Sequence, residues 1–357
     1  MSIQAEVQAT AATTSPTATA AAGGFAICAN INAPAGSCTA IVGPNGAGKT
    51  TLIGVLAGLV PLQRGKVVLA NQVVDEPAQQ IWVPPEHRPI ALHNQHNLLF
   101  PHLSVVDNVA FGPQSAGIPK PQARHTALEW LERVGLSDLA TAHPTQLSGG
   151  QAQRVGLARA AACQPKVLLL DESLAALDAT TRSNIRHLIA DIDATKVLVT
   201  HDPVEARILA DEMLIMEDGL ITQSGTPQEI ATNPKTRFTA SLMNLNLFTG
   251  HCAGTTATLD CGLTLTTATS AHGPVLVTFS PTAITLSAQQ PQSSARNVWE
   301  TTVNRTQPDQ DRVRVLLGQP APCWAWITPQ AMSELHITDG SRCWAALKAT
   351  ELTVQQA

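Results

Sequence analysis

The segment GPNGAGKT, residues 43–50, limits what this chain can fold into more than any other feature of its sequence. A short apolar run that ends in glycine, CTAIVG at residues 38–43, precedes the segment, and a predicted helix over residues 50–59 follows it. Glycines let the backbone curl so that successive N–H groups face one point, and the start of the helix adds the positive end of its dipole. A strand, loop and helix of this kind surround phosphate groups. The residues expected to contact bound phosphates are Gly43, Pro44, Asn45, Gly46, Ala47, Gly48, Lys49, Thr50 and Thr51.

The same segment fits the P-loop pattern G-x-x-x-x-G-K-[ST] and is followed in the chain by a matching acidic motif. Lys49 supplies a mobile positive charge for the β- and γ-phosphates, and the hydroxyl of Thr50 is placed to bind Mg²⁺. The run VLLLDE, residues 167–172, predicts a buried strand that carries Asp171 to its carboxyl end, where a carboxylate can hold the Mg²⁺ shell. Glu172 would polarise an attacking water as a general base. Together the two motifs predict a P-loop nucleoside triphosphatase.

Hydrophobic patterning predicts two domains in the 357 residues. The unbroken apolar runs 167–170, 197–200 and 213–216 are typical of strands covered by helices on both faces, which favours a mainly parallel sheet in an α/β domain over residues 1–235. Helices are predicted at 121–135 and 150–162, and strands at 2–7, 25–33 and 66–72. Residues 8–22, rich in Ala and Thr, are expected to form an unordered hairpin connection. After a linker at 236–246, short Val/Thr/Leu runs over 247–357 predict a small all-β domain, with a helical turn or two near 329–335.

Composition narrows the function classes. A net charge of −5 argues against a nucleic-acid partner, which requires a basic face. No stretch is apolar and long enough to cross a bilayer, and no secretory signal is recognisable, so we expect a cytoplasmic protein. The seven cysteines form no CxxC pair and are expected to be small buried hydrophobes. The histidines His93, His96 and His102 are expected to lie on a surface loop, not in a metal site.

A third motif, LSGGQAQRVGLARA at residues 147–160, resembles the signature of ABC ATPases. Its glycine-rich start precedes a helix, so it is physically a second phosphate cradle. In that family two copies pair head to tail, and each signature closes on the γ-phosphate held by the P-loop of the other copy. The resemblance therefore implies ATP as the nucleotide, a homodimer, a helical subdomain at about residues 95–160, and a site completed in trans by Leu147, Ser148, Gly149, Gly150 and Gln151.

The resemblance extends to three further positions. Gln95 resembles the Q-loop glutamine, which contacts Mg²⁺ and the water and senses the membrane partner; Asp178 resembles the D-loop aspartate at the dimer interface; His201 resembles the switch histidine that positions the γ-phosphate. The chain departs from the family at Ser173, where proline is usual, and at Ala175, where the D-loop has serine. Both departures are expected to slow turnover without abolishing it. The usual aromatic residue that stacks on adenine is also missing, with Phe25 as the nearest substitute.

The tail, residues 294–354, resembles the TOBE or Mop-type barrel, an OB-like fold, of molybdate-importer ATPases, with SARN at its start and LKAT near its end as the specific pieces. In that family such barrels bind molybdate or tungstate between copies, which implies an oxyanion site and possible regulation by its ligand. The residues implied are Ser294, Arg296, Asn297, Lys348 and Thr350. The competing interpretation is that Arg296 and Lys348 only pin strands together.

The favoured function is the ATPase subunit of a molybdate or tungstate importer. It would lie peripherally on the cytoplasmic face of the plasma (inner) membrane, bound to permease subunits and served indirectly by an external substrate-binding protein. The alternatives are the same role for sulfate, iron or another small solute, a soluble ABC protein acting on ribosomes or DNA, and a catalytically silent regulator. The complete set of Lys49, Asp171, Glu172 and His201 argues against the last.

Overall fold

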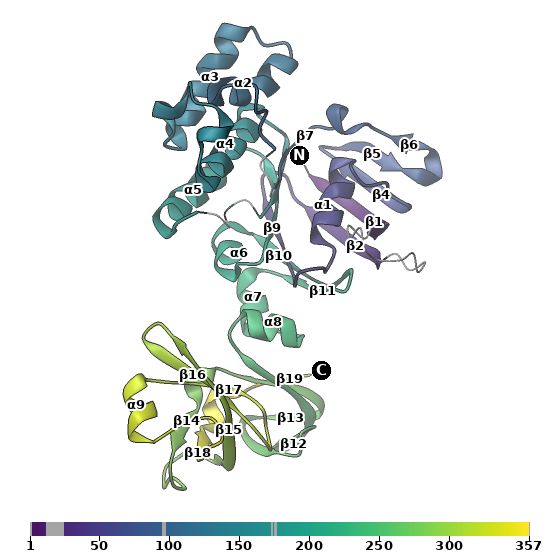
Figure 1. Cartoon of the computed structure of the whole chain (residues 1–357). Coiled ribbons are helices and arrows are strands. Elements are labelled where there is room, and N and C mark those ends of the chain that lie inside the picture. Colours follow the sequence, from purple (N-terminus) through teal and green to yellow (C-terminus); the bar gives the residue numbers. More distant parts are fainter. Residues whose placement is uncertain (1, 12–24, 95–97, 173, 175–176, 357) are drawn as a thin grey trace, which may run out of the picture. The chain divides into compact units, whose positions relative to one another are not determined.

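The computed structural model describes residues 2–11, 25–94, 98–172, 174 and 177–356. The chain divides into two compact units, residues 1–230 and residues 231–357 (Figure 1). Each unit has its own core, and each is considered by itself below. Among the described residues, no helix is both long and apolar enough to span a membrane.

The first unit is built on one mixed sheet, with strands in the order β6-β5-β4-β1-β2-β11-β10-β3-β9-β8-β7. Its strands are β1 (Ile3–Ala11), β2 (Phe25–Ala33), β3 (Cys38–Val42), β4 (Arg64–Leu69), β5 (Gln72–Glu76), β6 (Ile81–Trp82), β7 (Ile90–His93), β8 (Val167–Asp171), β9 (Thr195–Thr200), β10 (Glu212–Glu217) and β11 (Leu220–Gly225). Its helices are α1 (Lys49–Ala57), α2 (Val105–Ser115), α3 (Lys120–Arg133), α4 (Gly149–Ala162), α5 (Ala179–Asp191), α6 (Pro203–Leu209) and α7 (Pro227–Thr232), the last of which runs across the boundary between the units.

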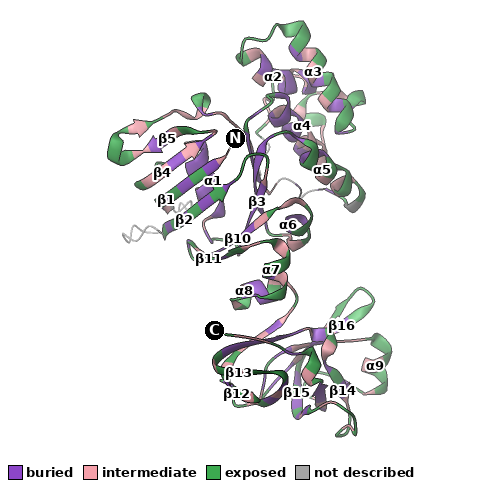
Figure 2. Cartoon of the chain, turned by 180° about the vertical axis from the view of Figure 1, so that it is seen from behind, coloured by how far each residue is buried: buried purple, intermediate pink, exposed green. Residues whose placement is uncertain are grey.

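The prediction of a mainly parallel sheet is correct for one half of this sheet and wrong for the other. Strands β7, β8, β9, β3 and β10 are parallel, as their unbroken apolar runs indicate. Strands β6, β5, β4, β1 and β2 pair antiparallel. Strand β1 alternates buried and exposed residues along its length, the pattern of a sheet with one covered face (Figure 2). The same alternation carries β1 to Ala11, so the expectation of an unordered connection from residue 8 is wrong for residues 8–11.

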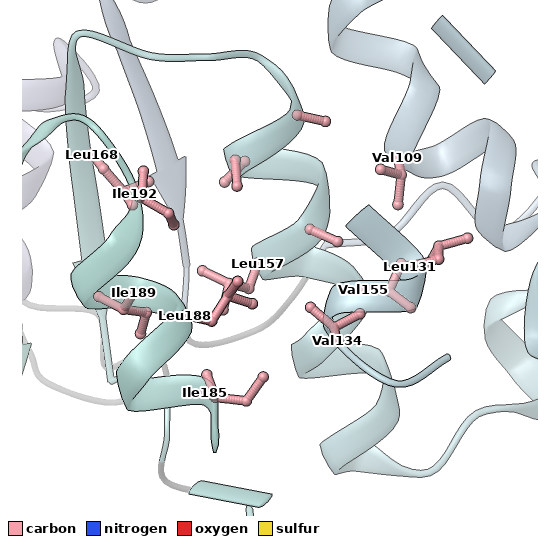
Figure 3. Close-up of a cluster of buried hydrophobic side chains, with 14 of the residues drawn as sticks. Val109, Leu131, Val134, Val155, Leu157, Leu168, Ile185, Leu188, Ile189 and Ile192 are labelled. Atoms are coloured by element: carbon pink, nitrogen blue, oxygen red, sulfur yellow. The ribbon is translucent and has the colours of Figure 1, made fainter. Parts of the chain in front are cut away.

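Helices α2 to α5 share a hydrophobic core with strand β8. Val155 and Leu157 of α4 are fully buried and lie between side chains of α3 and α5 (Figure 3). On the α3 side they meet Leu131, and on the α5 side Leu188 and Ile189. Burying one such side chain contributes about 1.5–3 kcal/mol to the free energy of folding. This packing fixes the N-terminus of α4, which carries the LSGGQ motif.

A buried arginine supports the far end of α1. The guanidinium of Arg88 donates hydrogen bonds to the carbonyl oxygens of Val55 and Leu56, both at 2.9 Å, in the last turn of that helix. It also forms an ion pair with Asp75 of β5 at 3.0 Å, and both side chains are almost completely buried. The charge of Arg88 at the helix C-terminus complements the helix dipole and adds hydrogen-bond donors to carbonyl groups of the last turn.

The second unit is an all-β domain, as predicted, and its strands pair antiparallel. Its two sheets have the orders β12-β13-β19 and β14-β18-β15-β16-β17. Its elements are α8 (Arg237–Leu242), β12 (Asn246–Leu259), β13 (Thr264–Phe279), β14 (Thr285–Ser287), β15 (Asn297–Asp309), β16 (Arg312–Leu317), β17 (Trp324–Ile327), α9 (Pro329–Glu334), β18 (Arg342–Leu347) and β19 (Thr353–Gln356). Helix α8 lies in the segment expected to be a linker, and α9 confirms the short helix predicted near 329–335.

Candidate functional site

Three neighbouring parallel strands carry the chemical motifs to one edge of the sheet. Strand β9 lies between β3 and β8, with Val42 opposite Thr200 and Asp171 opposite Val199. Because the strands run in the same direction, their carboxyl ends meet at one edge, where ligands bind in open α/β sheets. Gly43, His201 and Glu172, the residues that follow these strands, therefore converge as the sequence predicted.

The loop between β3 and α1 has the backbone that a phosphate cradle requires. A Cβ atom at Gly43 would lie 2.0 Å from the carbonyl oxygen of Met216, so only glycine fits there. Gly46 and Gly48 have φ angles of 82° and 101°, in the left-handed region that glycine adopts without strain. Helix α1 begins directly after, at Lys49, so its first N–H groups open toward the loop. The loop thus fits the triphosphate of a nucleotide.

Lys49 lies over this loop. Its ammonium group donates hydrogen bonds to the carbonyl oxygens of Gly43 at 2.8 Å and Pro44 at 2.9 Å. Burial lowers the pKa of Lys49, while the nearby carboxylates of Glu172 and Asp171 raise it. The P-loop lysine therefore shares one electrostatic environment with the two acids of the second motif. Thr50 is exposed and Thr51 is half-buried next to it.

Glu172 is held in an unusual backbone conformation. Its φ angle is 49°, which is uncommon for a residue other than glycine, asparagine or aspartate. Its N–H donates to the carbonyl oxygen of Val199 at 3.0 Å, and its own carbonyl oxygen accepts from the side-chain amide of Gln153 at 3.1 Å. Its carboxylate lies 3.5 Å from Nδ1 of His201. Both neighbouring elements, β9 and α4, thus fix the position of this acid.

A polar network behind His201 was not predicted from the sequence. The hydroxyl of Thr200 donates to the buried carboxylate of Glu205 at 2.5 Å and accepts from the N–H of Asp202 at 3.0 Å. Arg182 and Arg186 of α5 each lie 3.6 Å from the carboxylate of Asp202. A small pocket lies between Glu172 and this network. The signal in the sequence was the spacing of Arg182 and Arg186 by one helical turn, which places both on the same face.

The LSGGQ segment forms a helix start, as its glycines indicate. Ser148 caps α4: its hydroxyl accepts from the N–H of Gln151 at 3.3 Å, and the side chain of Gln151 accepts from the N–H of Ser148 at 2.8 Å. Ser148 and Gly149 are exposed, Leu147, Gly150 and Gln151 half-buried. Among the described residues, no hydrogen bond or ion pair joins this segment to the P-loop. Both glycine-rich segments are therefore formed, and in the part of the chain that the structure describes they are separate.

Other predicted residues fall into three groups. Asp178 is exposed and caps α5 by accepting from the N–H of Thr181 at 3.0 Å. Gln95, His96, Ser173, Ala175 and the side chain of Phe25 lie outside the part of the chain that the structure describes. His93 was expected on a surface loop, and that expectation is wrong, because His93 is buried at the end of strand β7 and its Nε2 donates to the carbonyl oxygen of Gln153 at 2.9 Å. No cluster of metal-ligating side chains occurs among the residues described.

In the second unit, the two ends of the tail segment lie side by side. Strands β15 and β18 pair so that Asn297, the last residue of SARN, is opposite Leu347, the first residue of LKAT. Ser294, Arg296, Lys348 and Thr350 are exposed. Asn297 is buried, and its amide exchanges two hydrogen bonds with the backbone of Thr266, at 2.6 and 3.0 Å. Within one chain this amide therefore links the start of β15 to β13.

Comparisons with known proteins agree with this geometry. The ABC transporter family model matches residues 28–175, and the TOBE domain model matches residues 293–354. The molybdenum import ATP-binding protein ModC of Mycobacterium tuberculosis (strain H37Rv) is 38% identical over 348 residues, 90% of this chain and 92% of its own length. The spermidine/putrescine import ATP-binding protein PotA of Roseobacter denitrificans is 43% identical over 213 residues, 58% of this chain and 57% of its own length.

Among solved structures, the chain is similar to a dimeric structure of a post-hydrolysis state of the ATP-binding cassette MJ0796 bound to ADP and Pi. The sequences are 28% identical, the TM-score is 0.53, and the match covers 64% of this chain and 99% of the other. The residues matched by the ABC transporter family model include the P-loop, the VLLLDE motif and the LSGGQ segment. The similarity to ModC extends over both units. The chain therefore belongs to the ABC transporter family of ATPases, as an ATP-binding protein with a C-terminal TOBE domain.

Proposed function

We propose that this ATPase is the energising subunit of a bacterial importer of molybdate or tungstate. One observation carries the choice of solute: the similarity to the molybdenum import ATPase covers 90% of the chain, including the C-terminal unit, whereas that to the polyamine ATPase covers 58%. The nucleotide machinery is common to importers of many solutes, so similarity confined to it does not discriminate between them. The pairing of the SARN and LKAT segments supports the same choice.

In the proposed reaction, water attacks the γ-phosphorus of ATP, the bond to the β–γ bridging oxygen breaks, and ADP and phosphate are released. Glu172 accepts the proton of the attacking water, and His201, 3.5 Å away, orients that carboxylate. Lys49 and the amides of the P-loop stabilise the charge that develops on the phosphate oxygens. Thr50, Asp171 and Gln95 would hold Mg²⁺, which neutralises negative charge on the phosphates.

The second cradle acts on the other copy. Ser148 and its two following glycines open a helix N-terminus to solvent, so they can close on the γ-phosphate held by a partner chain. Asp178 would lie at the same interface. The dimer would dock on two permease subunits at the cytoplasmic face of the membrane, and closure on ATP would move the permease. An external substrate-binding protein would deliver the oxyanion, with no nucleic acid involved.

The solute is tested by uptake measurements in the source bacterium after deletion of the gene. Uptake of labelled molybdate should fall to background and return with the intact gene, but not with the Glu172→Gln variant. Unchanged molybdate uptake, with loss of sulfate, iron or polyamine uptake instead, would favour the second candidate, the same ATPase role for another solute. The 43% identity to the polyamine ATPase is the observation behind that candidate.

A further inference from the structure

A cavity of about 380 Å³ lies wholly within the second unit and belongs to none of the sites described so far. It is open to solvent on one side and is lined by α8, the first residues of β12, the turn after β12, and the paired strands β16 and β17. Its volume is in the range of small-molecule sites. None of the five residues implied for an oxyanion site lines it.

Arg314 of β16 is the central polar group of this cavity. Its guanidinium lies 4.2 Å from the ring centre of Trp324 and 6.0 Å from that of Trp326. Its Nε is buried and has no hydrogen-bond acceptor among the described residues. No carboxylate of the described residues forms an ion pair with it. The ring of Trp324 holds the guanidinium in place, and the two terminal nitrogens of Arg314, which bond to none of the described residues, are the donors that a ligand can reach.

The charges around the cavity favour an anion. Arg314 and Arg237, at the start of α8, both line it, and among the described residues Asp260 is the only acidic one that does. Two positive charges against one negative leave a net charge of +1. The carboxylate of Asp260 already accepts a hydrogen bond from the hydroxyl of Thr249. The guanidinium groups of Arg314 and Arg237 are therefore the charged groups of the cavity that remain available to bind an anion.

The walls of the cavity combine apolar and polar side chains and are preformed. Phe248, Leu316 and Trp324 supply its apolar surface. The buried amide of Asn246 donates to the carbonyl oxygen of Trp324 at 2.9 Å and accepts from the N–H of the same residue at 2.8 Å. This double hydrogen bond ties the start of β12 to β17, so the cavity does not need to be assembled by the ligand.

We propose that this cavity binds a small organic anion, with its charged group on Arg314 and Arg237 and its apolar body against Phe248, Leu316 and Trp324. A single tetrahedral oxyanion would leave most of the 380 Å³ unfilled and would not use the apolar walls. The site thus differs in ligand class from the predicted oxyanion site. It does not depend on which solute the transporter carries.

The test is isothermal titration calorimetry of the full chain with its nucleotide site filled by Mg·ADP. The probe is naphthalene-2-sulfonate, and its neutral analogue is naphthalene-2-sulfonamide. The sulfonate should bind with one molecule per chain, and the sulfonamide at least about tenfold more weakly, because it cannot form charge-assisted hydrogen bonds with the arginines. Arg314→Gln should weaken sulfonate binding by a similar factor. Arg312→Gln, a change in the same strand outside the cavity, should leave binding unchanged.

Arg237→Gln provides a second variant, since this exposed residue can be changed without disturbing the core. It should weaken sulfonate binding several-fold. The proposal is overturned by any of three results: no heat with the sulfonate, equal binding of the neutral analogue, or full affinity in both the Arg314→Gln and Arg237→Gln variants. None of these measurements involves transport, so the solute assignment and this proposal can fail separately.

Discussion

The side chain of Gln153, in the helix that follows the LSGGQ motif, donates a hydrogen bond to the backbone oxygen of Glu172 over 3.1 Å. The backbone oxygen of Gln153 in turn accepts from His93 at the end of β7. One residue of the signature helix therefore connects the strand that leads to Gln95 with the proposed general base. Since Glu172 has a positive φ, its carboxylate direction depends on such restraints.

Replacing Gln153 by Ala should lower the rate of ATP hydrolysis about fivefold while KM for ATP changes little. The lost hydrogen bond is worth about 1 kcal/mol and fixes the acid, not the nucleotide. Steady-state kinetics of the purified protein separate kcat from KM. Gln122→Ala, at an exposed position of α3, serves as the control and should behave like the wild type. If KM rose by the factor predicted for the fall in kcat, and kcat itself stayed unchanged, a positioning role would be contradicted.

Replacing Gly43 by Ala should abolish ATP binding, because the added methyl group would overlap the carbonyl oxygen of Met216 and displace the loop. The matched control is Gly117→Ala. Gly117 has a φ of 87° but open space around it, so alanine there costs only backbone strain of about 1 kcal/mol. Equilibrium binding of a fluorescent ATP analogue measures both variants. Normal affinity in Gly43→Ala would show that the loop geometry is not required.

Replacing Arg88 by Met should destabilise the protein by about 3–5 kcal/mol, because it leaves Asp75 as a buried, unpaired charge. The control is Lys66→Met. Lys66 forms a neighbouring ion pair with Glu76 at 3.2 Å, but its side chain is 43% exposed, so less than about 1 kcal/mol is expected. Urea unfolding monitored by circular dichroism gives both values. Similar losses in the two variants would contradict a special role for Arg88.

The carboxyl group of Glu205 should make stability depend on pH. Burial raises its pKa above the ordinary 4.5, as does the charge of Asp202, while the hydrogen bond from Thr200 and the charges of Arg186 and Arg182 lower it. A raised pKa means that the folded state binds more protons than the unfolded state. The contribution of Glu205 is therefore fully present below pH 4.5 and is lost as the pH rises through the folded-state value.

Glu205→Gln removes this titration and keeps an acceptor for Thr200. The melting temperature of the variant, relative to the wild type, should rise between pH 4.5 and 8. Glu86→Gln, at an exposed position, should show a flat difference over the same range. A difference between Glu205→Gln and wild type that stays constant with pH would mean that Glu205 has the same pKa in both states.

The elements that the sequence predicts well are those whose pattern has a single explanation. The strands at 38–43 and 167–170 and the helix at 121–135 match β3, β8 and α3 to within about two residues, because apolar runs between glycines and an amphipathic stretch each suit one element. Strand β7 was not predicted, since its four residues carry no pattern of their own. The antiparallel half of the sheet depends on pairings between distant strands, which local patterns do not specify.

The same distinction holds for the site. Lys49, Asp171, Glu172 and His201 could be found because their side chains sit in recognisable motifs. Gln153 could not be assigned its role from the sequence, because it acts on a backbone oxygen 19 residues further along the chain. Only the fold brings the two together.

We propose that Glu172 activates the water in a nucleotide site that a second chain completes. The ATPase rate of Glu172→Gln, measured together with its mass in solution in the presence of Mg·ATP, tests both parts of this mechanism. The rate should be at least about 100-fold below wild type, and the variant should accumulate as an ATP-bound dimer. Hydrolysis at the wild-type rate by the variant, or by an isolated monomer, would contradict it.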